Sequence, residues 1–190
     1  MANADPDDLA TAPWTRLSRR VVYENTWIRV EEDIVRVPNG HETIYGVVRC
    51  ADAVGILPFV DDDHVLLVRQ WRYVTKVTTW EMPTGGMHDG ETPIEAAQRE
   101  LAEEAGVRAG RLEHVSTHVT SKSIVDETAH LFLARDLVPA SAPPDDTEFI
   151  NRHVVGFDQA LGWVLDGTIV DSMTIIAVLV AARRRDHRHA

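Results

Sequence analysis

The sequence predicts a mixed α/β domain with helices on both sides of a sheet, preceded by a small N-terminal antiparallel β unit. Segments of strand-like composition alternate with a few helical segments, one of them in the middle of the chain. Turn signals such as Pro38-Asn39-Gly40 separate these segments. The 190 residues are enough for one well-buried domain with an extension.

The N-terminal part is expected to contain a flexible tail, residues 1–13, and a β unit, residues 14–49. The tail is polar and contains two prolines. The β unit should contain strands near residues 17–23, 27–37 and 42–49. So small an antiparallel piece is marginal alone, so it must pack on the main domain or on another subunit.

The main domain is expected to cover residues 50–190. Strands are predicted at residues 53–60, 64–70, 78–82, 112–120, 130–134 and 151–156, and late helices at residues 158–166 and 171–185. The Asp61-Asp62-Asp63 run is predicted to be a solvated hairpin tip, with a metal site as the alternative.

Composition narrows the possible partners and compartment. The net charge of −11 argues against nucleic acid, because no large basic surface is available. The longest apolar run, residues 175–182, is too short to span a membrane, and the N-terminus lacks the apolar core of a signal peptide. A single cysteine, Cys50, fits the reducing cytoplasm. An acidic enzyme can still take a phosphorylated substrate if a metal supplies positive charge.

The stretch from residue 85 to residue 107 is the organising segment of the chain. Its first half is rich in glycine, which suits a tight loop. Its second half is a predicted helix: Thr92 is the N-cap, Pro93 the first helical residue, and Glu95 completes a capping box. Gly106 fits the left-handed position after the last turn.

This predicted helix carries two different faces. A narrow apolar stripe formed by Ile94, Ala97, Leu101 and Ala105 is expected to face the core. Three glutamates lie within an arc of about 100° on another side, where they repel one another. A divalent cation would turn this repulsion into chelation, and Mg²⁺ takes oxygen ligands beside substrate phosphates. These glutamates are Glu100, Glu103 and Glu104.

The segment resembles a complete Nudix box, with the spacing Gly85-x5-Glu91-x7-Arg99-Glu100-Leu101-x-Glu103-Glu104-x-Gly106. The resemblance implies an α/β/α sandwich with a mixed sheet, preceded by the N-terminal β unit. It also implies an enzyme, a Nudix pyrophosphohydrolase, in which water attacks a phosphorus of a nucleoside diphosphate derivative and Mg²⁺ or Mn²⁺ stabilises the charge.

The resemblance also implies roles for individual residues. Glu100, Glu103 and Glu104 would bind the metal, together with the backbone carbonyl of Thr84. Arg99 would form a salt bridge with Glu91 that holds loop and helix together, the alternative being a surface i,i+4 pair between Arg99 and Glu103. The structural residues of the box would be Gly85, Glu91 and Gly106.

The flanking segments resemble those of ADP-ribose pyrophosphatases. They are Arg69-Gln70-Trp71-Arg72 and Trp80-Glu81-Met82-Pro83-Thr84-Gly85. In that group an arginine at the position of Arg72 binds the pyrophosphate, and Glu81 is expected in the same substrate site; a surface ion pair is the alternative for Arg72. Glu127 would be the catalytic base, unless a box glutamate such as Glu103 takes that role.

The N-terminal unit is expected to contribute to substrate binding and to dimerisation. Trp14, Trp27 or Tyr45 could stack on a base, with burial in a core as the alternative for each. Proteins of the resembled group pair two subunits through this unit, so a homodimer is expected. The expected substrate is ADP-ribose or a related nucleoside-diphosphate sugar. The alternatives are a dinucleoside polyphosphate, NADH, or a sensor that binds nucleotide without hydrolysing it.

Overall fold

The computed structural model describes residues 13–140 and 149–189, and these form two compact units. The first unit contains residues 13–51 together with residues 120–127. The second contains residues 52–119, 128–140 and 149–189. The predicted flexible tail, residues 1–13, lies outside the described residues except for Pro13.

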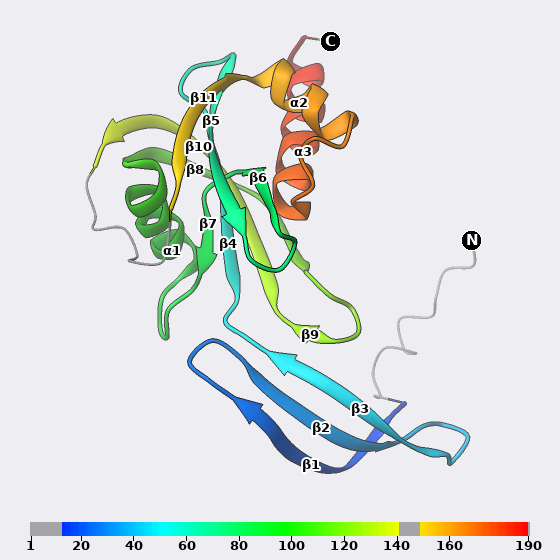
Figure 1. The fold of residues 1–190 in the computed structure, drawn as a ribbon. Coiled ribbons are helices and arrows are strands. Elements are labelled where there is room, and N and C mark those ends of the chain that lie inside the picture. The colour runs from blue at the N-terminus through cyan, green and yellow to red at the C-terminus, as the bar shows by residue number, and fades with distance from the viewer. Residues whose placement is uncertain (1–12, 141–148, 190) are drawn as a thin grey trace. The chain divides into compact units, whose positions relative to one another are not determined.

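The first unit is a four-stranded sheet in the order β1-β2-β3-β9. The first three strands are antiparallel, as predicted, and β9 joins β3 in parallel (Figure 1). Gly40 has a φ of 85° in the turn before β3, a conformation that suits glycine. The strands are β1 (Thr15–Glu24), β2 (Arg29–Arg36), β3 (Glu42–Arg49) and β9 (Val125–Asp126).

The second unit contains two sheets. One is mixed, in the order β7-β4-β10-β8, with β4 and β10 parallel and the other neighbours antiparallel. The other is antiparallel, in the order β11-β5-β6. The strands are β4 (Ala53–Pro58), β5 (His64–Arg72), β6 (Val77–Glu81), β7 (Thr84–Gly86), β8 (Val107–Val119), β10 (Thr128–Pro139) and β11 (Asn151–Gly156).

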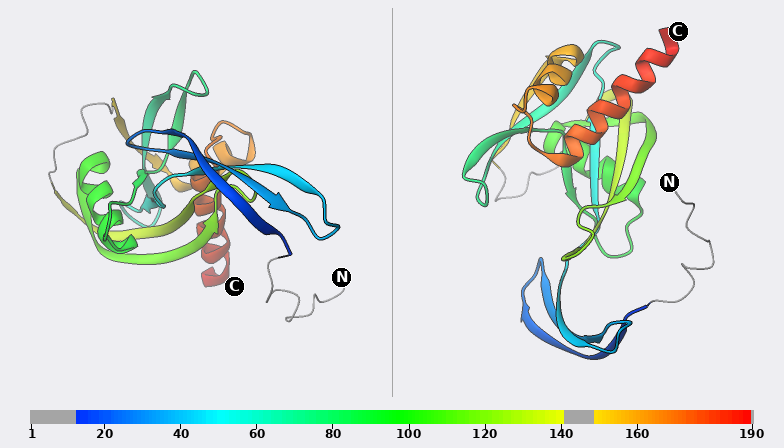
Figure 2. Two further views of the ribbon diagram at one scale, coloured as in Figure 1. Left: turned by 90° about the horizontal axis from the view of Figure 1, so that it is seen from below. Right: turned by 90° about the vertical axis from the view of Figure 1, so that its right-hand side faces the viewer.

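Helices cover both faces of the mixed sheet, because its central strands alternate apolar residues between two cores. Val54, Ile56 and Phe132 face one core, formed with the mid-chain helix, whereas Leu57 and Leu131 face the other, formed with the last helix. Figures 1 and 2 show α1 and α3 on opposite sides of this sheet. The α/β/α sandwich is therefore confirmed. The helices are α1 (Pro93–Glu100), η2 (Leu101–Ala105), α2 (Phe157–Leu165) and α3 (Ser172–His189).

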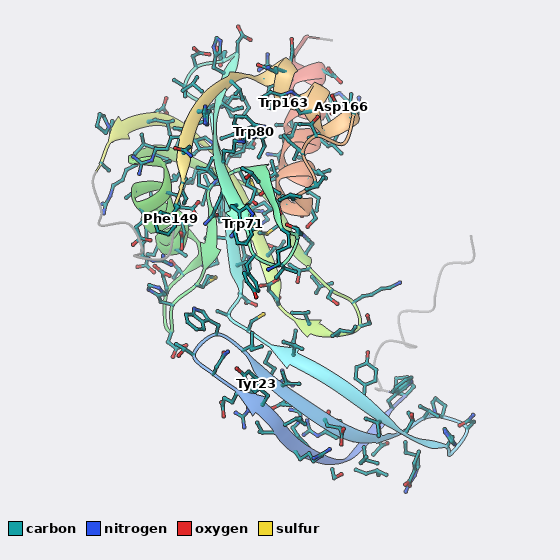
Figure 3. The ribbon with its side chains drawn as sticks, viewed as in Figure 1. Tyr23, Trp71, Trp80, Phe149, Trp163 and Asp166 are labelled. Carbon is teal, nitrogen blue, oxygen red and sulfur yellow. The ribbon has the colours of Figure 1, made fainter. Side chains whose placement is uncertain are left out.

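Strand β6 is anchored from one side by an aromatic stack. Trp80 lies against Trp163 of α2, with ring centroids 4.8 Å apart and an interplanar angle of 26° (Figure 3). Neighbouring residues of a strand point to opposite faces, so Glu81 points away from this stack. The packing of Trp80 thus aims Glu81 at the other face of the sheet.

Several elements differ from the sequence-based expectation. The short strands β7 and β9 form where loops were expected. Strand β8 begins at Val107, directly after the helix, instead of near residue 112. The mid-chain helix is α-helical only to Glu100 and continues as a π-helix over η2. None of the helices in residues 13–140 and 149–189 combines the length and apolar composition needed to cross a membrane.

Candidate active site

The loop-helix segment begins and ends as its sequence predicts. The Thr92 hydroxyl accepts a hydrogen bond from the Glu95 N–H, and the Glu95 carboxylate accepts one from the Thr92 N–H at 2.9 Å. These two bonds form the predicted capping box, with Pro93 in the first turn. Gly106 ends the segment with a φ of 69°.

The predicted apolar stripe is correct for three residues and wrong for Ile94. Ala97, Leu101 and Ala105 are buried, whereas Ile94 is 58% exposed. Along the helix, burial begins only at Ala96, so the first turn lies outside the core. The periodicity identifies the correct face but does not show where along the helix the contact with the sheet begins.

The three box glutamates are not a solvated cluster. Glu100 and Glu104 are only 5% and 2% exposed. The Glu100 carboxylate lies so close to Gly85 that a Cβ at that position would collide with it. A glycine is therefore needed at position 85 to admit this carboxylate.

Arg99 neutralises part of the expected repulsion. Its Nη1 contacts Glu100 Oε1 at 2.5 Å and Glu103 Oε2 at 3.1 Å. Its Nη2 donates to Glu91 Oε2 at 2.9 Å, so the expected ion pair between loop and helix is present, together with the alternative pair to Glu103. The hydrogen bond from Arg99 lowers the pKa of Glu91 to about 2, and Glu91 in turn raises the pKa of Arg99.

Thr84 is attached to the helix through its backbone. Its N–H donates to Glu104 Oε2 at 2.8 Å. In an antiparallel ladder, pairs that exchange hydrogen bonds alternate with pairs that do not. Ile56 and Pro83 form a hydrogen-bonded pair, because Pro83 O accepts from the Ile56 N–H at 2.9 Å. The next pair, Gly55 and Thr84, is therefore one that does not exchange hydrogen bonds. Both backbone polar groups of Thr84 therefore point away from β4, and its carbonyl points to the same side as the N–H that reaches Glu104.

A threonine that the sequence analysis did not identify fixes the start of this loop. The buried Thr174 accepts the Met82 N–H at 3.0 Å and donates to Asp171 Oδ2 at 2.6 Å. Asp171 also accepts the Thr174 N–H at 2.8 Å at the start of α3. The Asp-x-x-Thr pattern before an apolar run signals a helix start, but it does not name Met82 as the partner.

Arg72 and Glu81 lie together on the sheet face opposite the Trp80 stack. The Arg72 Nε donates to Glu81 Oε1 at 2.9 Å, and Arg72 Nη2 and the Thr79 hydroxyl also contact this carboxylate. Glu81 is 5% exposed, and its hydrogen bond with Arg72 raises the pKa of the guanidinium. The pair is thus anchored on a buried carboxylate rather than lying wholly at the surface.

The donor set of the box fits a hard divalent cation. Carboxylate and carbonyl oxygens are the ligands that Mg²⁺ prefers. Within residues 13–140 and 149–189, no three acidic, histidine or cysteine side chains are already gathered as a ligand set. Arg99 instead bridges Glu100 and Glu103, so a cation bound here would share these carboxylates with Arg99.

The alternative metal site at the hairpin tip receives no support. Each aspartate there binds a basic side chain of its own, which explains the acidic run without a cation. Asp61 contacts His64 Nδ1 at 2.9 Å, Asp62 contacts Arg135 at 3.2 Å, and Asp63 contacts Arg185 at 2.9 Å.

The first unit brings two of the three predicted aromatic residues together. Trp14 and Tyr45 meet edge to face, with centroids 5.7 Å apart, and line a pocket of about 340 Å³ with Asp33, Val35 and Val47. That volume falls within the range of small-molecule sites. Trp27 is 76% exposed, so it is not buried in a core. It follows the far end of β1, whose ten residues span roughly 30 Å.

Glu127 also belongs to the first unit. Its Oε1 lies 3.5 Å from Cys50 Sγ, and its carbonyl accepts the Thr120 N–H at 3.2 Å. The preceding residue, Asp126, is paired with Arg49 of β3. The loop that carries Glu127 is thus attached to the N-terminal strands.

Comparisons with known proteins agree with this architecture. The family model described as NUDIX domain matches residues 50–172, and the model described as nucleoside diphosphate sugar hydrolase N-terminal domain matches residues 14–48. The fold and the complete box define a Nudix pyrophosphohydrolase. The chain belongs to the Nudix family, so the predicted family, fold and enzyme class are confirmed.

Individual relatives cover most of the chain. The methanol dehydrogenase activator of Bacillus methanolicus is 30% identical over 159 residues, which is 83% of this chain and 86% of that protein. The ADP-ribose pyrophosphatase of Bacillus subtilis (strain 168) is 29% identical over 164 residues, covering 85% and 89%. A crystal structure of an ADP compounds hydrolase shares the fold, with a TM-score of 0.84, 24% identity and coverage of 93% and 96%.

Proposed function

We propose that the protein hydrolyses the pyrophosphate bond of ADP-ribose or a related nucleoside-diphosphate sugar, giving a nucleoside monophosphate and a sugar phosphate. The observation that carries this proposal is the combination of two matches in one chain. A complete Nudix box lies in the second unit, and the N-terminal match is to a nucleoside diphosphate sugar hydrolase region. The similarity to a protein named ADP-ribose pyrophosphatase supports the same substrate class.

In this proposal the box holds Mg²⁺ or Mn²⁺ through Glu100, Glu103, Glu104 and the Thr84 carbonyl. The bound metal stabilises negative charge on the phosphoryl oxygens. Arg99 keeps the helix attached to the loop through Glu91. These roles are supported by the convergence of Thr84 on Glu104 and by the ion pair between Arg99 and Glu91.

Arg72 and Glu81 are proposed to act at the substrate. A guanidinium held by a buried carboxylate is preorganised, and it can still offer its remaining N–H donors to a phosphate. Glu127 is the proposed base for the attacking water, with Glu103 as the alternative within the box. A cytoplasmic location, supported by the single cysteine Cys50, completes the proposal.

The N-terminal unit is proposed to bind the base and to form a homodimer. The pocket beside Trp14 and Tyr45 offers an aromatic wall, and Trp27 is available at the other end of β1. Val22 and Ile44 are 53% and 62% exposed and offer apolar surface to a second subunit. Sedimentation of the intact protein should therefore give a dimer, and a fully active monomer at micromolar concentration would contradict this part.

A substrate panel tests the reaction directly. The intact protein is incubated with Mg²⁺ and ADP-ribose, other nucleoside-diphosphate sugars, dinucleoside polyphosphates or NADH, and released AMP and phosphate are measured after phosphatase treatment. ADP-ribose or another nucleotide sugar should give the highest kcat/KM. Preference for a dinucleoside polyphosphate or NADH would overturn the substrate class, and nucleotide binding without turnover would indicate a sensor.

A further inference from the structure

The C-terminal end of the box helix has an unusual backbone pattern. The Gly106 N–H bonds to the Leu101 carbonyl, five residues earlier, so η2 is a π turn. An α-helix would have used the carbonyl four residues earlier. The last carbonyls of any helix lack partners within the helix and need donors from elsewhere.

Arg152 of β11 supplies such donors. Its Nε donates to the Glu104 carbonyl at 2.5 Å, and its Nη2 donates to the Glu103 carbonyl at 2.9 Å. One guanidinium thus holds the backbone of both glutamates. The side chains of the same two residues point to Arg99 and to the Thr84 N–H.

Gly106 leaves the space that this guanidinium occupies. A Cβ at position 106 would lie 2.6 Å from Arg152 Nη1, and the φ of 69° already disfavours other residues. The glycine that ends the box therefore serves the backbone turn and the approach of Arg152 together.

We propose that Arg152 is a positioning residue that keeps Glu103 and Glu104 aimed at the metal-binding face; this rests on the proposed function of the box. If the π turn relaxed to α-helical bonding, the register would change by one residue, which is a rotation of about 100°. The Glu104 carboxylate would then leave the Thr84 N–H. By binding both carbonyls, Arg152 fixes the backbone of the last turn, which carries these two glutamates.

Charge and geometry can be separated by the choice of substitution. A lysine keeps a positive charge at the negative end of the helix dipole, but it cannot reproduce the planar fork that reaches two carbonyls. Arg152→Lys therefore tests the two-pronged contact, and Arg152→Met removes the charge as well. Arg185→Lys is the matched control, because Arg185 also contacts a backbone carbonyl, that of Asp62, together with the Asp63 carboxylate at 2.9 Å.

The experiment measures Mn²⁺ binding, turnover and folding on the intact protein. Mn²⁺ affinity is obtained from the electron paramagnetic resonance signal of free Mn²⁺, and kcat and KM are measured with ADP-ribose at saturating Mg²⁺. Arg152→Lys should weaken Mn²⁺ binding and lower kcat by about tenfold each, the lower end of the range for groups that orient metal ligands. The KM of Arg152→Lys should stay within twofold of the wild type. Arg185→Lys should match the wild type in Mn²⁺ affinity, kcat and KM.

Several outcomes would overturn the inference. The inference is wrong if folded Arg152→Lys has a Mn²⁺ affinity and a kcat within twofold of the wild type. It is also wrong if Arg152→Lys lowers the melting temperature but leaves the Mn²⁺ affinity unchanged. Absence of Mn²⁺ binding in the wild type would overturn it as well. A wild type that binds Mn²⁺ but hydrolyses no nucleotide would instead overturn the proposed function, and the binding comparison would still test Arg152.

Discussion

The two units bury acidic side chains in different ways. In the first unit, Glu31 and Asp33 are 4% and 6% exposed and lie on one face of β2. Arg19 contacts both carboxylates, at 2.8 Å and 2.7 Å, and Arg49 contacts Glu31 at 2.7 Å. Hydrogen bonds from Arg49 and Arg19, respectively, lower the pKa values of Glu31 and Asp33.

The box helix has a different balance. The guanidinium of Arg99 contacts Glu91, Glu100 and Glu103, and Glu104 accepts a backbone N–H. On the paired strands, Arg19 lies directly opposite Asp33, and Arg49 of β3 reaches Glu31 from a position two residues along the ladder, which closes the network. A helix instead stacks acids on one side, where several carboxylates can bind the same cation. The first network is thus suited to stabilising the sheet, and the second is suited to binding a metal ion.

The largest expected effect is the loss of kcat on replacing the proposed base, and it tests whether Glu127 of the first unit or Glu103 of the box has that role. Glu127→Gln should lower kcat by about 10²- to 10⁴-fold, the usual contribution of a general base, with KM within threefold. Steady-state kinetics with ADP-ribose measures both constants. If Glu127→Gln keeps full kcat while Glu103→Gln abolishes it, the base lies in the box.

Neutralising a box carboxylate should affect turnover more than folding. Glu104→Gln should lower kcat by at least about 100-fold, on the scale of losing one charge-stabilising group. The amide oxygen can still accept the Thr84 N–H, so the melting temperature should change little. Glu113→Gln is the control, because Glu113 of β8 forms a partly exposed pair with Arg184 of α3. Activity of Glu103→Gln and Glu104→Gln within threefold of wild type would disprove the metal-site assignment.

The ion pair between Glu91 and Arg99 should make the free energy of unfolding depend on pH in the acidic range. The pKa of Glu91 falls from 4.5 to about 2 in the folded protein. Its contribution to the free energy of unfolding is therefore complete above pH 4.5 and is lost as the pH falls towards 2. Glu91→Gln should lower stability by roughly 1–3 kcal/mol at pH 7 and by progressively less below pH 4.5. Urea unfolding between pH 7 and pH 3 measures this, and a difference independent of pH would contradict it.

Thr174→Val should have the smallest effect on rate. The substitution leaves the buried Met82 N–H without its acceptor, which costs about 1–3 kcal/mol of stability. It loosens the segment that leads to Thr84, so kcat should fall about three- to tenfold. Thr174→Ser keeps the hydroxyl and should recover most of both losses. Equal kcat for the valine and serine variants would show that this hydrogen bond does not act on the site.

Local patterns predicted most elements of the fold. The longer strands, the capping box and the terminal glycine of the box could be predicted, because each depends on neighbours within a few residues. The short strands β7 and β9 could not, because they form by pairing with distant strands. The π turn could not be predicted either, because an α-helix and a π turn have the same composition over five residues. The exposure of Ile94 was also missed, because periodicity does not show where a helix leaves the sheet.

Within the candidate site, the box residues could be identified from the sequence, but several residues that hold them in place could not. Glu100 and Glu104 follow from their spacing. Thr174 and Arg152 act on residues 92 and 48 positions away in the chain, Met82 and Glu104, so no local pattern connects them. Gly106 was predicted for its left-handed backbone, and its second reason, the approach of Arg152, requires the tertiary structure.

Residues 120–127 carry a consequence for how proteins of this architecture can be recombined. This segment interrupts the second unit, and its strand β9 adds to the edge of β3 in the first. A chimera that exchanged only residues 14–48 would pair a foreign β3 with the original β9, and Arg49 would keep Asp126 but lose its other partner, Glu31. Inheritance of a working N-terminal unit therefore involves two stretches of the gene, and the second of them brings Glu127 with it.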